Sequence, residues 1–304
     1  MTAPLSGVLV VDKPAGPTSH DVVARVKKAL AVRRAGHTGT LDPFATGVLP
    51  VCVGKATRLA RFLSAGEKSY RATVRLGFAT STDDVDGEPL GPPRPVALDP
   101  AALDLACRGL RGEILQVPPM FSARHVAGKR LYEWAREGVA VTRPPARVTL
   151  HALEVVEVRG EEIQLDVRCS AGTYVRALAR DLGEALGCGA HLSALRRTRS
   201  GGLGLEDSVT WEEIGEACLP RLRPLETLLP ELPAVWVNAE GREAVRHGRA
   251  VTPRHRLGGD PGPGVSRVRL VDSEGRLLAL ALTRGSGEGE PQELELRPDV
   301  VLID

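Results

Sequence analysis

The segment richest in residues that could do chemistry is 36–50, GHTGTLDPFATGVLP. It holds one histidine, His37, and one carboxylate, Asp42, among glycines and prolines, and a predicted strand follows it. Because Pro43 disfavours helical geometry at Asp42, we expect a rigid loop to hold the carboxylate beside that strand. Catalytic acids are often presented in this way. A simpler alternative stays open, in which Asp42 only caps the turn at residues 45–47.

A second group of candidates is a pair of arginines. Arg176 and Arg180 lie one turn apart on a helix predicted to begin at Thr173, on the side away from its apolar stripe. A guanidinium close to a buried carboxylate keeps that carboxylate ionised and fixes its orientation. The alternative is an arginine paired with Asp181 or Glu184 on a solvated face.

The third candidate is Tyr70, in a segment that alternates cleanly between apolar and polar residues from Ser69 to Leu76. Tyr70 lies on the apolar face of this predicted strand. Only 3% of the chain is aromatic, so Tyr70 could serve as a stacking surface. The alternative is an ordinary core tyrosine.

Neighbouring segments predict the elements that position these side chains. Residues 7–12 are typical of a short buried strand, and a helix capped by Thr18 or Ser19 follows it. A second alternating strand at 163–170 precedes the helix that carries the two arginines. Strands and helices are interleaved without a regular βαβ repeat, which predicts an α+β fold around a mixed sheet.

Two further segments depart from this sheet. Residues 124–147 contain six basic and two acidic side chains and are predicted to be a basic insertion. A linker with spaced prolines at 229–233 ends the first predicted domain. Beyond it, a short basic helix at 242–249 and strands at 265–271 and 277–283 predict a small β-rich second domain.

Composition limits the remaining possibilities. The net charge of +2 comes from 40 basic and 38 acidic residues and does not by itself indicate a nucleic-acid partner. The five cysteines form no C-x-x-C pair and the seven histidines show no ligand spacing, so neither a disulfide framework nor a metal site is predicted. No apolar run is long enough for a membrane helix. We therefore expect a reduced, soluble, cytoplasmic protein.

Read together, these motifs resemble those of the bacterial TruB-type tRNA pseudouridine synthases, which act on uridine 55 of the T loop. The resemblance is most specific at 36–50, the catalytic-aspartate segment of that family, and it spans nearly all of the first domain. The matching segments are 11–20, 36–50, 70–77, 118–124, 128–133, 169–176, 181–192 and 195–202.

The resemblance implies a fold and a set of site residues. The expected fold is a mixed-sheet catalytic domain at 1–230 with a thumb-like insertion at about 124–147, followed by a PUA-like RNA-binding domain at 233–304. Asp42 is expected to be the catalytic aspartate, Tyr70 the base-stacking tyrosine and Arg176 the partner of the aspartate. The residues expected to bind RNA are Lys13, His37, Arg124, Lys129, Arg130, Tyr174, Arg196 and Arg197.

The implied reaction breaks the N1–C1′ bond of uridine, turns the uracil and rejoins it through C5. It oxidises nothing, so no cofactor and no metal are expected. Asp42 could attack C1′ or remove the 2′ proton, and both routes need one ionised carboxylate at the sugar. The uridine must first be flipped out of its loop. The expected partner is the tRNA T arm, with no membrane, no obligatory protein partner and a monomeric enzyme.

Two alternative functions remain open at this point. The protein could be an RNA chaperone that holds the T arm open without using Asp42, alone or alongside catalysis. It could also act on another RNA, as the related guide-RNA-dependent enzymes of archaea and eukaryotes do. The full-length basic insertion favours recognition of the substrate without partner proteins.

Overall fold

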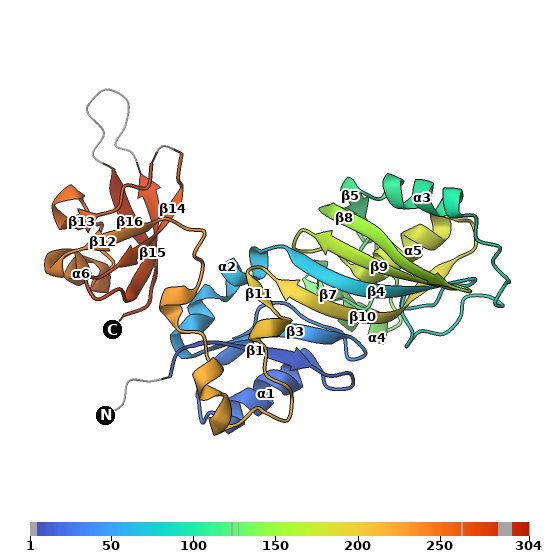
Figure 1. Ribbon diagram of the computed structural model, residues 1–304, viewed down its shortest axis with the longest axis horizontal. Helices are drawn as coiled ribbons and strands as arrows, with labels where there is room; N and C mark the ends of the chain where they lie inside the picture. Colours follow the sequence, from blue (N-terminus) through green and yellow to red (C-terminus); the bar gives the residue numbers. More distant parts are fainter. Residues whose placement is uncertain (1–4, 123, 127, 263, 285–293, 304) are drawn as a thin grey trace.

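The computed structural model describes residues 5–122, 124–126, 128–262, 264–284 and 294–303 (Figure 1). Within these residues, the strands form a nine-stranded, a five-stranded and a two-stranded sheet. The nine strands of the first sheet are β1 (Gly7–Lys13), β2 (Ala35–His37), β3 (Thr46–Val53), β4 (Lys68–Leu76), β5 (Gly112–Gln116), β8 (Ala146–Arg159), β9 (Glu162–Cys169), β10 (Ala190–Ser200) and β11 (Leu203–Gly204).

The first sheet is mixed, which confirms the predicted α+β class. Its main path runs β1-β3-β10-β4-β9-β8-β5, while β2 pairs with β3 and β11 pairs with β10. β10 lies parallel to β3, and the other neighbours are antiparallel. A strand from late in the chain thus separates β3 from β4.

Helices cover one face of this sheet. Val22 and Val26 of α1 and Leu178 of α5 pack in one cluster with Leu9 of β1 and Leu49 of β3. The helices of the chain are α1 (Ser19–Ala29), α2 (Ala60–Ala65), α3 (Pro100–Gly109), α4 (Leu131–Arg136), α5 (Val175–Ala185) and α6 (Ala239–Arg246). Short 3₁₀ helices span Gly54–Leu59, Leu205–Asp207, Glu216–Arg221, Leu225–Thr227 and Pro253–His255.

The opposite face of β1 and β3 is covered by the second sheet. Val8 and Val48 share a buried cluster with Leu280 and Leu302 from the C-terminal part of the chain. Strands covered on both faces have no polar side to show, which explains the unbroken apolar run at 8–11.

The second sheet lies at the opposite end of the molecule from α3 and β5 (Figure 1). Its strands, in the order β13-β12-β14-β15-β16, are β12 (Ala234–Val237), β13 (Arg256–Gly258), β14 (Arg267–Val271), β15 (Leu277–Arg284) and β16 (Glu295–Val301). Sequence patterns predicted β14 and β15 and placed α6 three residues late. They missed β12 and β13, which have four and three residues, and β16, in which charged residues and a proline interrupt the apolar ones.

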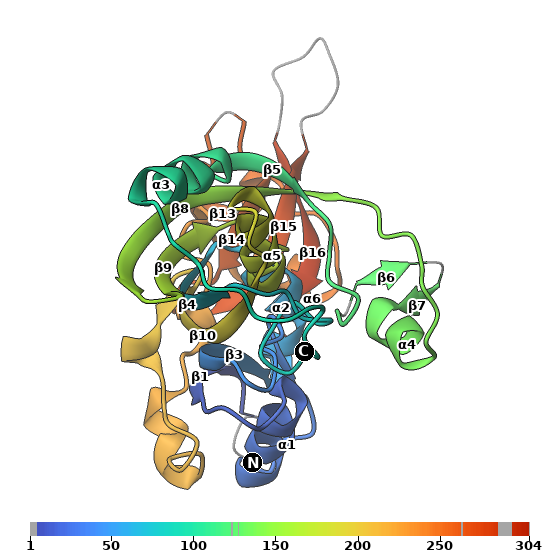
Figure 2. The ribbon, with the colours of Figure 1, turned by 90° about the vertical axis from the view of Figure 1, so that its right-hand side faces the viewer.

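The basic insertion stands away from the first sheet (Figure 2). It contains the two-stranded sheet of β6 (His125–Val126) and β7 (Lys129–Arg130), followed by α4. The segment between β5 and β8 comprises residues 117–145, so it begins earlier than the expected 124–147. In the part of the chain described here, no helix is long and apolar enough to cross a membrane.

α1 begins with a complete capping box and ends under strain. Thr18 and Asp21 exchange side-chain and backbone hydrogen bonds at its N-terminus. At its C-terminus Ala31 adopts a φ of 50°, a left-handed conformation that usually requires glycine. This conformation of Ala31 turns the chain after α1 so that it can enter β2.

Ala31→Gly is therefore expected to stabilise the protein by about 0.5–1 kcal/mol, because glycine adopts this conformation without a Cβ clash. Urea unfolding measures the change. Ala29→Gly, inside the same helix, is the matched control and should destabilise by about 1 kcal/mol. Equal effects of the two substitutions would contradict the strain at Ala31.

Candidate active site

The loop between β2 and β3 carries Asp42, and hydrogen bonds from Lys13 hold this loop in place. Lys13, at the end of β1, is 0% exposed. Its Nζ donates to the carbonyl oxygens of Pro14 at 2.9 Å, Pro43 at 3.0 Å and Ala45 at 2.7 Å. All three N–H donors of the ammonium group are thus satisfied by backbone carbonyl oxygens, two of which belong to the loop.

Two more side chains hold the same loop. Ser19 Oγ accepts from the Leu41 N–H at 2.8 Å and donates to the Leu41 carbonyl at 3.0 Å. Arg197, 1% exposed, donates to the carbonyls of Gly39 at 3.1 Å and Val48 at 2.7 Å. Gly47 has a φ of 102°, and a Cβ there would lie 2.2 Å from the Arg197 carbonyl oxygen. The backbone conformation and this close contact therefore require glycine at position 47.

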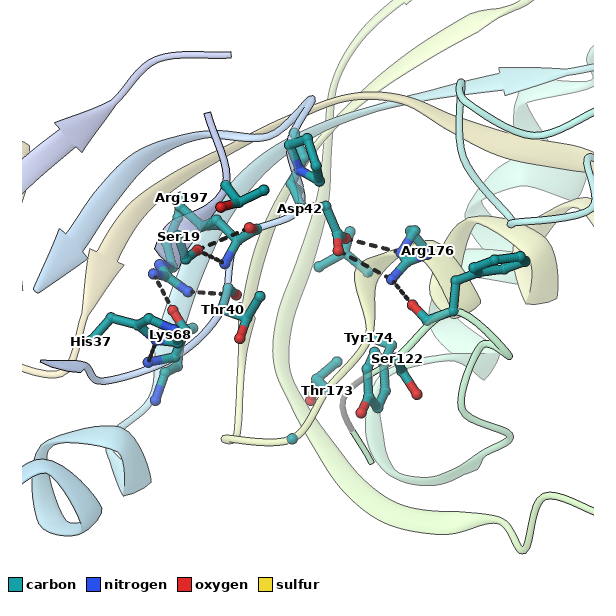
Figure 3. A pocket seen from close by; sticks show the side chains of 18 of the residues that line it. Ser19, His37, Thr40, Asp42, Lys68, Ser122, Thr173, Tyr174, Arg176 and Arg197 are labelled. Carbon is teal, nitrogen blue, oxygen red and sulfur yellow. Dashed lines mark hydrogen bonds and ion pairs between the residues drawn. The ribbon is translucent and has the colours of Figure 1, made fainter. Parts of the chain in front are cut away.

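Arg176 pairs directly with Asp42 at the wall of a pocket (Figure 3). Its Nε lies 3.0 Å from Asp42 Oδ2 and its Nη2 lies 3.3 Å from Asp42 Oδ1. The same guanidinium contacts Asp84 Oδ2 at 3.1 Å and donates to the Phe121 carbonyl at 2.7 Å. Arg176 is 5% exposed, so these contacts fix its plane firmly. Its helix, α5, begins at Val175, two residues after the predicted start.

The structure bears differently on the two alternatives that the sequence leaves open, one for Asp42 and one for the arginines. Asp42 closes its turn only through its backbone carbonyl, which accepts from the Ala45 N–H at 3.1 Å, while its carboxylate faces Arg176. Arg180 makes the pair that the alternative proposed, with Asp181 at 2.8 Å, and also pairs with Asp83 at 2.9 Å. Its side chain is only 18% exposed, so the pair does not lie on a solvated face.

The electrostatic environment of Asp42 contains opposing influences. Burial raises the pKa of Asp42, whereas the positive charges of Arg176 and Lys13 lower it. The carboxylate remains 31% exposed, towards the pocket. Arg176 therefore opposes the cost of keeping a partly desolvated carboxylate ionised and open to a ligand.

A pocket of about 890 Å³ lies beside this pair. Its walls come from the start of α1, the β2–β3 loop, β4, the basic insertion and the N-terminus of α5. Tyr70, His37 and Tyr174 line it together with Asp42 and Arg176. The three candidate motifs of the sequence thus meet at one cavity.

The surroundings of Tyr70 and His37 favour the neutral form of both side chains. Burial raises the pKa of Tyr70, with Arg197 opposing that change. Burial, followed by Arg197 and His20, lowers the pKa of His37. Nδ1 of His37 accepts from the Gly39 N–H at 3.3 Å, which places any ring proton on Nε2.

The structure places the other residues that are expected to bind RNA in different surroundings. Arg130 lines the pocket, and Lys129 is exposed on the insertion, 3.0 Å from Glu137. Arg124 is half-buried, and Arg196 pairs with Asp12 at 2.6 Å.

Lys13 and Arg197, both expected to bind RNA, are buried, and their side chains donate to backbone carbonyls. Lys13 does not line the pocket, so it holds the loop. Arg197 forms part of the pocket wall.

Two further residues at the site, Asp84 and Lys68, were not predicted from the sequence. Asp84, 4% exposed, holds Arg176 from the side opposite Asp42. Its only signal in the sequence was the acidic run at 83–86. Lys68 lines the pocket two residues before Tyr70 on β4.

The chain matches two family models. Residues 27–175 match the model described as TruB family pseudouridylate synthase (N terminal domain). Residues 176–230 match the model described as tRNA pseudouridylate synthase B C-terminal domain. Asp42 and Arg176 thus fall in adjoining models.

Curated relatives and solved structures are similar over most of the chain. The tRNA pseudouridine synthase B of Burkholderia pseudomallei (strain 668) is 44% identical over 91% of this chain and 93% of its own length. That of Ralstonia nicotianae is 44% identical over 95% and 93%. The fold is similar to that of a chain in a Cbf5-Nop10-Gar1 complex, with a TM-score of 0.76 and 29% identity over 98% of this chain and 85% of the other. With two adjoining family matches and these relatives, the chain belongs to the TruB family of pseudouridylate synthases.

Proposed function

We propose that this protein converts uridine 55 in the T loop of tRNA to pseudouridine. The observation that carries the proposal is the Asp42–Arg176 pair at the wall of a pocket that Tyr70 also lines. The relatives named tRNA pseudouridine synthase B support tRNA as the substrate. A flipped uridine is of a size that a pocket of about 890 Å³ can hold.

The geometry suits chemistry at a sugar carbon. Arg176 opposes the rise in the pKa of Asp42 that burial causes and orients the carboxylate, which acts at C1′ or at the 2′ proton of the ribose. Tyr70 offers its ring as a stacking surface for the uracil. The surrounding walls exclude water that would otherwise trap the opened sugar. When the base rejoins through C5, the C5 proton leaves to solvent and N1 takes up a proton, so the composition is unchanged.

The basic insertion supplies the RNA contacts nearest the pocket. Arg130 and Arg136 both lie against the Tyr132 ring, at 5.9 and 5.4 Å, and all three line the pocket. Such stacked guanidiniums suit backbone phosphates and exposed bases. We assign residues 1–230 to a catalytic domain and 233–304 to an RNA-binding, PUA-like domain of a monomeric, cytoplasmic enzyme.

The proposal is tested with unmodified tRNA carrying [5-³H]uridine. Formation of pseudouridine displaces the proton at C5, so the wild-type enzyme is expected to release tritium. Release should vanish when uridine 55 is replaced by cytidine. Binding of the tRNA without any release of tritium would contradict the proposal and favour a chaperone.

A further inference from the structure

Three buried cations near Asp42 have no carboxylate within ion-pair distance among the residues described. They are Lys13, Lys68 and Arg197, with exposed fractions of 0%, 6% and 1%. Each donates its hydrogen bonds to backbone carbonyls instead. Burying a charge without an opposite charge is costly, so such groups are unusual unless a ligand uses them.

Counting hydrogen-bond donors distinguishes the two lysines. Lys13 uses all three donors of its ammonium group and does not line the pocket. Lys68 donates to the carbonyls of Ser64 and Gly66, the latter at 2.6 Å. Because an ammonium group has three donors, Lys68 retains one that no described residue accepts, and Lys68 lines the pocket.

The place of Lys68 matches the expected path of a bound nucleotide. Lys68 and Tyr70 are two residues apart on β4, so they lie on the same face of the strand. Lys68 lies on the side of the pocket that carries His37 and Arg197 (Figure 3). A base against Tyr70 would therefore leave its sugar–phosphate backbone within reach of the lysine.

The charge around Lys68 favours an anion. Burial, followed by the positive charge of Arg197, lowers the pKa of Lys68 to about 8, so the ammonium group is mostly protonated at neutral pH. Among the described residues that line the pocket, Asp42 is the only carboxylate, and it is paired with Arg176. The basic residues that line it are Lys68, Arg130, Arg136, Arg176 and Arg197.

We propose that Lys68 binds, through its third N–H, a backbone phosphate of the RNA next to the uridine that enters the pocket. The proposal rests on the proposed function, because it takes RNA as the ligand. Lys68 is then a substrate-binding residue that sets the position of the flipped nucleotide against Tyr70. Its two other bonds hold the ammonium group at the end of α2 and so fix where the phosphate is received.

The test is a double-mutant cycle between the protein and single phosphates of the RNA. A T-arm stem–loop carries a neutral methylphosphonate at each loop linkage in turn, and the reference RNA has the same 2′-deoxy sugar with a charged phosphate. The full chain and K68M are compared by equilibrium binding. At one linkage, neutralisation should weaken wild-type binding by about 5- to 20-fold and leave K68M binding unchanged. K68M should also lower the slope of log affinity against log salt by about one.

Two controls separate a specific contact from a general loss of charge or of folding. K68R keeps the charge and should retain sensitivity to the same linkage. K28M removes an exposed lysine of α1, and its effect should multiply with that of every methylphosphonate. If the K68M and methylphosphonate effects multiply at every linkage, Lys68 binds no phosphate. Failure of the proposed function is seen separately, as absence of tritium release by the wild type on the unmodified RNA.

Discussion

Asp42→Asn is expected to lower the rate of pseudouridine formation by about 10⁴-fold or more, because it removes the negative charge that acts at the ribose. The amide keeps the shape of the side chain, so the β2–β3 loop, held by Lys13, Ser19 and Arg197, should stay in place. RNA affinity should therefore change by less than about threefold. Single-turnover tritium release measures the rate, and equilibrium binding of the same RNA measures the affinity.

The matched control for this substitution is Asp21→Asn. Asp21 is an exposed carboxylate that caps α1 and does not line the pocket. Its replacement should lower the stability only slightly and leave the rate within about twofold. An Asp42→Asn enzyme with more than a tenth of the wild-type rate would show that the carboxylate is not needed.

The second large effect is expected for Arg176→Met, with a loss of about 10²- to 10³-fold in kcat. Arg176 lowers the pKa of Asp42 against the effect of burial. Without the guanidinium the pKa of Asp42 rises further, so the acidic limb of the pH–rate profile should move to higher pH. A substitution that only loosened the fold would lower the rate without moving this limb.

Arg180→Met provides the comparison, because Arg180 lies one turn further along α5 and contacts Asp83 and Asp181 instead of Asp42. It should lower the melting temperature and leave the acidic limb in place. If Arg176→Met and Arg180→Met give the same pH profile, Arg176 does not control the ionisation of Asp42.

Local signals in the sequence predicted the parts of the site and not their mutual support. The turn at Asp42 follows from Pro43 and Gly47, and the helix of Arg176 follows from its apolar stripe. The partners of Arg176 are not local, since the carboxylate of Asp84 lies 92 residues away and the carbonyl of Phe121 lies 55 residues away. No periodicity encodes such contacts.

The burial of Lys13 and Arg197 was also beyond the sequence, for a related reason. A lysine or arginine is normally exposed, so residue type alone predicts that both side chains are available to RNA. Backbone carbonyls of the β2–β3 loop accept hydrogen bonds from both side chains and so make their burial tolerable. Every residue type has the same backbone carbonyl, so the sequence does not show where such acceptors lie. Strand β16 was missed for another reason. Only Leu296 and Val300 of this strand are buried, so its sequence shows little alternation of apolar and polar residues.

The place of β10 between β3 and β4 has a consequence for the chain during its synthesis. Strands β3 and β4 leave the ribosome long before residues 190–200, and until then each exposes an edge that later becomes the centre of the sheet. Asp42 and Arg176 are likewise separated by 134 positions. A nascent chain that ends before residue 176 therefore has the carboxylate without its arginine, and its open strand edges are prone to aggregation. The two side chains can meet, and the sheet can close, only after β10 has been made.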